Sequence, residues 1–196
     1  YKRQVLDPAR PAVFVDTDAV KAVESRADTL VENRAEAEWI VRMSDMLIQA
    51  NVAAADIGIL TPYRQQAKLL RDRCACEVLT VDQAQGRDWP VVLVSLVRSN
   101  KTRTVGELLR DQRRVNVMIT RAKTKLVLVG SYSTMSHGPC TEPMPALLPL
   151  LRMIQPKEPA DIPVHVSPGR QRYVKKARRP TPVVTDLLNE QDCIAE

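Results

Sequence analysis

The sequence predicts an α/β fold of three layers, with a mainly parallel sheet of about five strands between two layers of helices. Short apolar runs rich in β-branched residues alternate with helical segments, as crossover connections between parallel strands require. Several of these runs are apolar at every position, which is typical of strands buried on both faces. Hydrophobic residues make up 44% of the 196 and only 4% are aromatic, so aliphatic side chains must build the core.

The first quarter of the chain supplies one expected strand and one long helix. Residues 1–11 are polar and contain prolines, and we expect them to form a linker into the domain. A strand is expected at 12–15, and residues 18–32, which show no clear period, are expected to form a loop or a short helix. Asn33 and Glu36 resemble a capping box at the start of a helix. Apolar residues recur at three-to-four spacing along this helix and place one face on the core, namely Trp39, Ile40, Met43, Leu47 and Ala50.

A second buried strand is expected at 57–60, and it leads directly into the segment 61–66, which reads TPYRQQ. Thr61 can cap a helix and Pro62 suits its first position, so the next residues lie in the first helical turn. A positive charge there, as at Arg64, opposes the helix dipole and is tolerated more readily where it has a function. Junctions between strand ends and helix starts are also where open α/β sheets bind ligands.

Two more strands are expected in the middle of the chain. The first, at 78–81, is followed by a polar turn at 82–88. The second, at 91–97, is the longest apolar run and therefore the expected central strand. A polar loop and a short helical segment at 98–110 lead into the next helix.

The stretch from Asp111 to Gly130 is expected to hold a helix that ends near Arg121, a basic turn at 123–125 and the last strand at 126–129. An arginine held at a helix end beside a packed sheet is a rigidly placed cation. We therefore expect Arg121 to point out of this domain, towards a phosphate bound mainly by another domain.

Beyond residue 131 the composition changes. One more amphipathic helix is expected at 144–154, so that the domain spans 12–155. Residues 156–196 form a Pro-rich basic tail that we expect to be disordered. Within it, 170–179 reads RQRYVKKARR, with six basic residues and no acid. A solvated tail, nuclear targeting and nucleic-acid contact all remain open for this cluster.

Composition and charge narrow the classes of function. The formal net charge of +6 fits a polyanionic partner. No apolar run is long enough to cross a membrane and there is no secretory signal, so we expect no membrane partner. The C-x-C pair Cys74 and Cys76 has no second pair nearby, so reduced thiols are expected and no metal site. Because the chain starts at Tyr1 and not at Met, we expect it to be a piece of a longer protein.

Three stretches carry a resemblance to a known family. They are 61–66 (TPYRQQ), 80–88 (TVDQAQGRD) and 113–123 (RRVNVMITRAK). In this order they resemble motifs IV, V and VI of the second RecA-like domain of superfamily 1 helicases, on the branch that moves 5′ to 3′. Each alone is a modest signal, but together, at the strand and helix boundaries expected above, they are a strong one. The resemblance covers about residues 12–131 and implies a RecA-like, P-loop-NTPase-type domain.

The text between the second and third stretches separates two families of that branch. VSLVRSN at 94–100 and VGELL at 105–109 are most similar to the DNA replication ATP-dependent helicase/nuclease family, which processes Okazaki fragments and DNA ends. The RNA helicases of nonsense-mediated decay share the motifs but are less similar between them. A non-enzymatic nucleic-acid-binding domain is the third alternative.

The resemblance implies a role for each matching residue in the ATP site. Arg64 and Arg121 would both contact the γ-phosphate of ATP and act as catalytic cations, since phosphoryl transfer depends on well-placed positive charge. Asp88, where many relatives have Glu, would reach the ribose. Gly86 would let the backbone approach closely, and Tyr63 would lie at the nucleotide cleft or pack beside Arg64.

The resemblance also implies partners. Thr80 would bind the nucleic-acid backbone, with Gln83 and Gln85 near the same face. No G-x-x-x-x-G-K-[ST] phosphate loop occurs in the sequence, so ATP and Mg²⁺ would be bound mainly by a preceding RecA-like domain and this segment alone would be inactive. A nuclease domain and an iron–sulfur cluster would lie upstream. Single-stranded or flapped DNA and a single-strand-binding protein are the further implied partners, and the nucleus, with the mitochondrion second, is the implied location.

Overall fold

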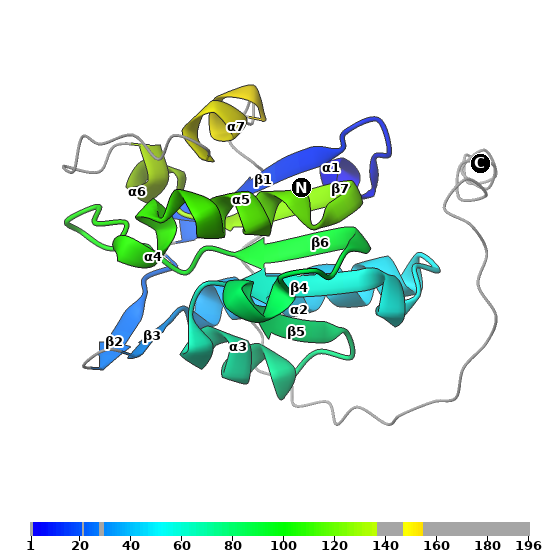
Figure 1. The fold of residues 1–196 in the computed structure, drawn as a ribbon, viewed down its shortest axis with the longest axis horizontal. Helices are drawn as coiled ribbons and strands as arrows, with labels where there is room; N and C mark the ends of the chain where they lie inside the picture. The colour runs from blue at the N-terminus through cyan, green and yellow to red at the C-terminus, as the bar shows by residue number, and fades with distance from the viewer. Residues whose placement is uncertain (1, 21, 28–29, 137–146, 155–196) are drawn as a thin grey trace.

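The centre of the computed structural model, which describes residues 2–20, 22–27, 30–136 and 147–154, is a parallel sheet of five strands (Figure 1). The strand order is β1-β7-β6-β4-β5, and each neighbouring pair is parallel. The strands are β1 (Ala12–Asp16), β4 (Ile57–Thr61), β5 (Glu77–Thr80), β6 (Trp89–Ser95) and β7 (Ala122–Gly130). The α/β class and the five-stranded parallel sheet are confirmed.

Helices cover both faces of this sheet, which makes the three expected layers. One apolar core joins the sheet to α2 (Arg34–Gln49) and α3 (Arg64–Arg71). The other joins it to α4 (Glu107–Arg110), α5 (Gln112–Thr120), α6 (Tyr132–Ser136) and α7 (Leu147–Met153). In β6, Val91 and Leu93 belong to the first core, whereas Val92 and Val94 belong to the second. This alternation explains why the strand is apolar at every position.

The start of the chain is packed onto the domain, where the sequence predicted a linker. Lys2–Leu6 form the helix α1, and the side chain of Val5 is buried. The buried Lys125 ammonium donates hydrogen bonds to the carbonyl oxygens of Gln4 at 2.9 Å, Asp7 at 2.8 Å and Arg10 at 2.5 Å. Because helix ends leave carbonyls without partners, this cation fastens the segment to β7.

The prediction of a basic turn at 123–125 is wrong. The strand β7 begins at Ala122, immediately after α5, and Ala122 pairs with Trp89. Lys125 pairs with Val91 and is buried under the N-terminal segment, so its charge does not mark a loop.

The region 18–32, predicted as a loop or a short helix, contains both a helical turn and a hairpin. A 3-10 turn, η1 (Asp18–Val20), is followed by the antiparallel strands β2 (Ser25–Ala27) and β3 (Leu30–Glu32). The hairpin extends beyond the main sheet (Figure 1). The hairpin does not lie between two layers of helices, and Leu30 is 51% exposed. The sequence of the hairpin therefore has no strong hydrophobic period.

Element boundaries differ from the expected ones at several motifs. As predicted, Trp39 is a core residue and Asn33 caps α2, because its side-chain oxygen accepts from the Glu36 N–H at 3.0 Å. The other half of the predicted capping box does not form, because the Asn33 N–H donates to Gln66 at 2.8 Å and not to Glu36. The helix α3 starts at Arg64, later than expected, since Tyr63 is still extended (φ −106°, ψ 124°). Short 3-10 turns form at η2 (Ala54–Asp56) and η3 (Val81–Ala84). The second begins at Val81, which was predicted as the end of a strand, and continues into the predicted polar turn. The tail 156–196, with its basic cluster, lies outside the described residues.

Candidate functional site

The parallel sheet has two different edges, and the predicted site residues divide between them. At what we call the carboxyl edge, the strands end, at Asp16, Thr61, Thr80, Ser95 and Gly130. At what we call the amino edge, they begin, at Ala12, Ile57, Glu77, Trp89 and Ala122. Tyr63, Arg64 and Thr80 lie at the carboxyl edge, whereas Asp88 and Arg121 lie at the amino edge.

Arg121 is held at the amino edge by the end of α5. The helix is capped at its start by the side chain of Asp111, and Arg121 follows its last residue. Its guanidinium donates to the carbonyl oxygen of Val117 at 3.1 Å and to the hydroxyl of Thr120 at 2.9 Å. A cation at a helix carboxyl terminus is stabilised by the helix dipole. The guanidinium is therefore fixed in position while 21% of the side chain stays exposed.

Arg121 forms an ion pair with the other predicted residue at this edge, Asp88. Nη1 of the arginine lies 3.0 Å from Oδ1 of the carboxylate. The two backbones are joined as well, since the Trp89 N–H donates to the Arg121 carbonyl at 3.0 Å. The two residues come from separate sequence motifs and are 33 positions apart (121 − 88). Their ion pair places one guanidinium and one carboxylate together at the amino edge.

Gly86 precedes this pair and has a positive φ of 79°, which favours glycine. A Cβ added at this position would have no atom within 4 Å. The backbone of this turn is therefore open to a close approach, which is the property that the resemblance implies for it.

Arg64 is not brought to Arg121. It is the exposed first residue of α3, beyond the carboxyl end of β4, whereas Arg121 precedes the amino end of β7. A strand of five residues spans about 17 Å, so the two guanidinium groups belong to opposite edges. The two arginines therefore lie apart within this chain, and the contact of both with one γ-phosphate, which the resemblance implies, stays a prediction.

Tyr63 packs inward rather than at the Asp88–Arg121 pair. It is 8% exposed and lies in a small cluster with Val31 and Val97. Burial raises the pKa of its hydroxyl, and the nearby Arg98 guanidinium opposes part of this shift. Tyr63 thus packs against Val31 and Val97 within the domain, and its predicted place at the nucleotide cleft or beside Arg64 stays a prediction.

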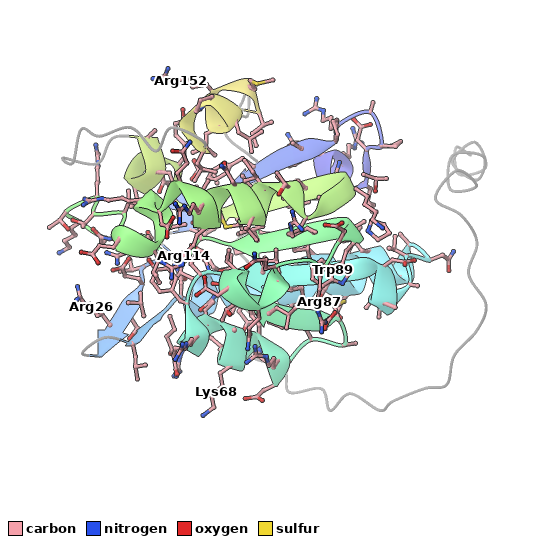
Figure 2. The ribbon with its side chains drawn as sticks, viewed as in Figure 1. Arg26, Lys68, Arg87, Trp89, Arg114 and Arg152 are labelled. Carbon is pink, nitrogen blue, oxygen red and sulfur yellow. The ribbon has the colours of Figure 1, made fainter. Side chains whose placement is uncertain are left out.

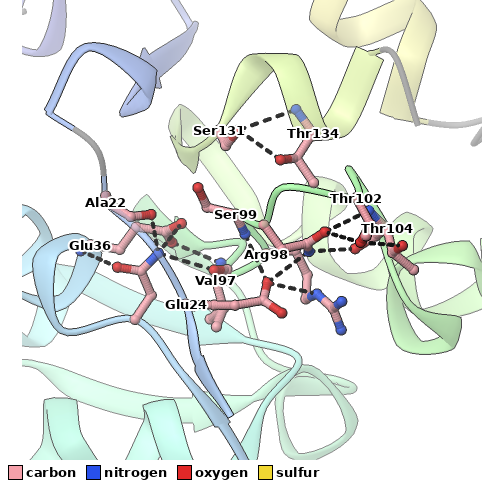
Figure 3. Close-up of polar contacts among 12 residues, drawn as sticks. Ala22, Glu24, Glu36, Val97, Arg98, Ser99, Thr102, Thr104, Ser131 and Thr134 are labelled. Carbon is pink, nitrogen blue, oxygen red and sulfur yellow. Dashed lines mark hydrogen bonds and ion pairs between the residues drawn. The ribbon is translucent and has the colours of Figure 1, made fainter. Parts of the chain in front are cut away.

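The carboxyl edge has a crevice position that the domain fills with its own side chains. After β4 the chain continues into α3 on one face of the sheet, whereas after β6 it continues to α5 on the other face. Open α/β sheets usually bind ligands between two such strands. Glu36, Gln66 and Ser95 occupy this position, and all three are fully buried. The Glu36 carboxylate accepts from the Ser95 hydroxyl at 2.8 Å. It also accepts from the Val97 N–H at 2.8 Å (Figure 3). Burial raises the pKa of Glu36 to about 8.

A second buried network follows β6, and sequence reasoning missed it. Val97 has a φ of 70°, and the Arg98 N–H donates back to the Leu96 carbonyl at 2.8 Å, which makes a strained γ-turn. This turn ends the predicted strand two residues early. It directs Arg98 onto Glu24, with Nε 3.0 Å from Oε2 and both side chains under 10% exposed (Figure 3). Buried arginines are rare without such a partner, but no spacing in the sequence joins positions 24 and 98.

The predicted nucleic-acid residues lie on the segment that crosses from the carboxyl edge to the amino edge. Thr80 is 8% exposed, and its N–H donates to the side-chain oxygen of Gln83 at 3.1 Å. The same oxygen accepts from Nη2 of Arg71 at 3.0 Å, so Gln83 braces the turn. Gln85 is exposed and directed away from the core. Of the three residues, Gln83 and Gln85 are exposed to a ligand, whereas Thr80 is buried.

Two other classes of site, a metal centre and a membrane span, are not found in the described part of the chain. In these ranges no three His, Cys, Asp or Glu side chains gather closely enough to hold a metal ion. No helix among the same residues combines the length and the apolar character needed to cross a bilayer.

Comparison with known proteins identifies the family. A family described as "AAA domain" matches residues 1–133, which contain the sheet, the Asp88–Arg121 pair and both edges. The chain belongs to this family. Within it, the chain is 47% identical over 149 residues to the DNA replication ATP-dependent helicase/nuclease DNA2 of Homo sapiens. It is 41% identical over 144 residues to the helicase/nuclease JHS1 of Arabidopsis thaliana, and 36% identical over 146 residues to DNA2 of Saccharomyces cerevisiae.

These matches cover much of this chain but little of the relatives. They include 74%, 71% and 71% of the chain, yet only 14%, 11% and 10% of the respective relatives. The resemblance to a superfamily 1 helicase domain of the helicase/nuclease group is confirmed. Most of the length of each relative therefore lies outside the part that this chain matches.

Proposed function

We propose that the full-length protein is an ATP-dependent 5′-to-3′ DNA helicase/nuclease of replication and repair, and that this chain is its second motor domain. The observation that carries the proposal is the Asp88–Arg121 pair at the amino edge, with 3.0 Å between cation and carboxylate. The names of the relatives, which are DNA replication helicase/nucleases, support the choice of DNA as substrate.

The two residues fit the two ends of a nucleotide. A guanidinium is planar and makes bidentate contacts with phosphate oxygens, and a carboxylate accepts hydrogen bonds from ribose hydroxyls. Both side chains are partly exposed, at 21% and 48%, so each can exchange its present partner for a ligand. Arg121 would stabilise the negative charge that develops on the γ-phosphate, and Asp88 would hold the ribose.

The rest of the ATP site would come from a preceding RecA-like domain. That domain would bind the phosphates and Mg²⁺, which neutralises phosphate charge during transfer. At the carboxyl edge of this chain, the position between β4 and β6 is occupied by the buried, hydrogen-bonded side chains of Glu36, Gln66 and Ser95. We infer that the isolated chain does not hydrolyse ATP.

Nucleic acid would contact the segment that holds Thr80, Gln83 and Gln85, and Arg64 lies at the same carboxyl edge of the sheet as Thr80. Opening and closing of the two domains would then move single-stranded or flapped DNA. A single-strand-binding protein as partner, a nuclease domain with an iron–sulfur cluster upstream, and a nuclear or mitochondrial location belong to the same proposal.

Unwinding by the full-length protein tests this function. Matched DNA and RNA duplexes, each with a 5′ or a 3′ single-stranded tail, would be supplied with ATP and Mg²⁺. We expect ATP-dependent unwinding of the DNA duplex with the 5′ tail. Equal unwinding of the RNA duplex would favour an RNA helicase, and no ATP-dependent unwinding would favour a non-enzymatic binding domain.

A further inference from the structure

Arg114, a residue of the third motif stretch that was assigned no role from the sequence, bridges two acidic residues beside the candidate site. Its Nε lies 2.9 Å from Oδ1 of Asp82, and its Nη1 lies 3.2 Å from Oδ2 of Asp111. Asp82 belongs to η3, within the segment that holds the predicted nucleic-acid residues. Asp111 caps α5, the helix that ends at Arg121. Arg114 therefore connects the nucleic-acid segment with the start of that helix.

The same segment is fastened to α5 a second time, at its other end. Arg114 and Arg121 are seven residues apart, which is about two helical turns, so they face the same side of α5 about 10 Å apart. Their partners, Asp82 and Asp88, are six residues apart on the neighbouring segment. Figure 2 shows Arg114 towards the carboxyl edge and Trp89, which follows Asp88, towards the amino edge.

Apolar contacts fill the space between these two ion pairs. Val81 and Ala84 are buried in the same core as Val115 and Met118 of α5. The segment and the helix run in the same direction across the sheet, and both end at the amino edge. The segment and the helix are therefore packed together between the two ion pairs.

We propose that Arg114 is a positioning residue that couples nucleic-acid binding by Thr80, Gln83 and Gln85 to the placement of Arg121 in the ATP site. The inference rests on the proposed function. Nucleic acid that grips the segment acts on Asp82, and through Arg114 on the start of α5, whose other end carries Arg121. Arg114 also contacts Asp111, the capping residue of α5. A shift of the Arg114 side chain would therefore move the whole helix as one rigid unit.

The expected loss of coupling follows from the solvent exposure of the Arg114–Asp82 ion pair. The Arg114 and Asp82 side chains are 36% and 62% exposed, and ion pairs of this kind contribute little energy. Loss of the pair should therefore change coupling by about two- to fivefold and leave the chemical step intact.

The experiment uses the full-length protein and its ATP hydrolysis with and without saturating single-stranded DNA. Arg114→Gln and Asp82→Asn should each leave the basal rate unchanged and lower the stimulation by DNA about two- to fivefold. The double variant should be no worse than Arg114→Gln alone, since that variant already removes the contact with Asp82. Arg114→Lys, which keeps the charge, should recover part of the stimulation. Arg73→Gln, which breaks an exposed ion pair with Glu38, is the matched control and should have no effect.

Three results would overturn the inference. These are unchanged stimulation in both single variants, additive losses in the double variant, or a fall in the basal rate with the stimulation ratio preserved. Asp82→Asn alters a more exposed side chain outside α5, so it decides the matter if Arg114→Gln does not fold. Arg121→Ala, assayed in parallel, tests the proposed function separately. If Arg121→Ala abolishes hydrolysis while the Arg114 and Asp82 variants behave as wild type, only the coupling fails.

Discussion

Replacing Lys125 by Met should destabilise the chain strongly, because this ammonium holds three backbone carbonyls of the N-terminal segment. Its distances to the oxygens of Gln4, Asp7 and Arg10 are 2.5–2.9 Å, and the side chain is 7% exposed. Hydrogen bonds to a charged group contribute about 1.5–3 kcal/mol each. Water can replace part of this at the freed carbonyls, so we expect a loss of about 2–4 kcal/mol in the free energy of unfolding.

The assay is denaturant and thermal unfolding of the 196-residue chain, with amide exchange followed at residues 4–10. For a chain of this size the expected loss lowers Tm by about 4–16 °C. Exchange in the N-terminal segment should rise more than exchange in the sheet, because the segment detaches first. Lys123→Met, on the same strand but exposed, is the matched control and should change stability by less than about 0.5 kcal/mol. A Lys125→Met protein as stable as this control, with unchanged exchange at 4–10, would refute the reasoning.

Three further predictions concern buried groups, and each is measured by denaturant unfolding. Gly58→Ala would place a Cβ 2.5 Å from the Trp89 ring, so it should lower stability by about 1–3 kcal/mol, and a neutral effect would contradict this packing. The pKa of Glu36 is raised from 4.5 to about 8 by burial, so the native state favours the protonated acid. The stability that the protonated Glu36 contributes is complete below pH 4.5 and is lost as the pH rises through 8. Glu36→Gln should therefore make the free energy of unfolding less dependent on pH between these values. The same pH dependence in both proteins would argue against the raised pKa. Arg98→Met leaves Glu24 buried without its cation and should cost about 3–5 kcal/mol, part of which Glu24→Gln should restore; a fully stable Arg98→Met would exclude the ion pair as described.

The sheet was predictable because every strand carries its own local signal. Apolar runs such as 91–97 are long enough to identify buried strands without tertiary information. The cap at Asn33 was equally local, since donor and acceptor are three residues apart. The hairpin at Ser25–Ala27 and Leu30–Glu32 was missed because strands outside a packed sheet carry no strong period.

The candidate site was harder to predict, because its residues meet only through the topology. Arg121 and Asp88 were identified singly from their motifs, but their contact depends on β6 and β7 being neighbours. For the same reason, Arg64 could not be separated from Arg121 until the direction of each strand was known. The sequence spacing of Arg114 and Arg121, about two helical turns, already indicates that both lie on one side of a helix. What they contact could be known only once their acidic partners, Asp82 and Asp88, were located.

The most direct test of the central claim is the DNA-stimulated ATP hydrolysis of the full-length protein with Arg121→Ala. The claim is that this side chain, fixed at the amino edge by α5 and paired with Asp88, stabilises the γ-phosphate during transfer. It predicts that kcat falls about a thousandfold or more while KM for ATP changes little, because the lost contact matters mainly in the transition state. An unchanged kcat in a folded Arg121→Ala protein would contradict it.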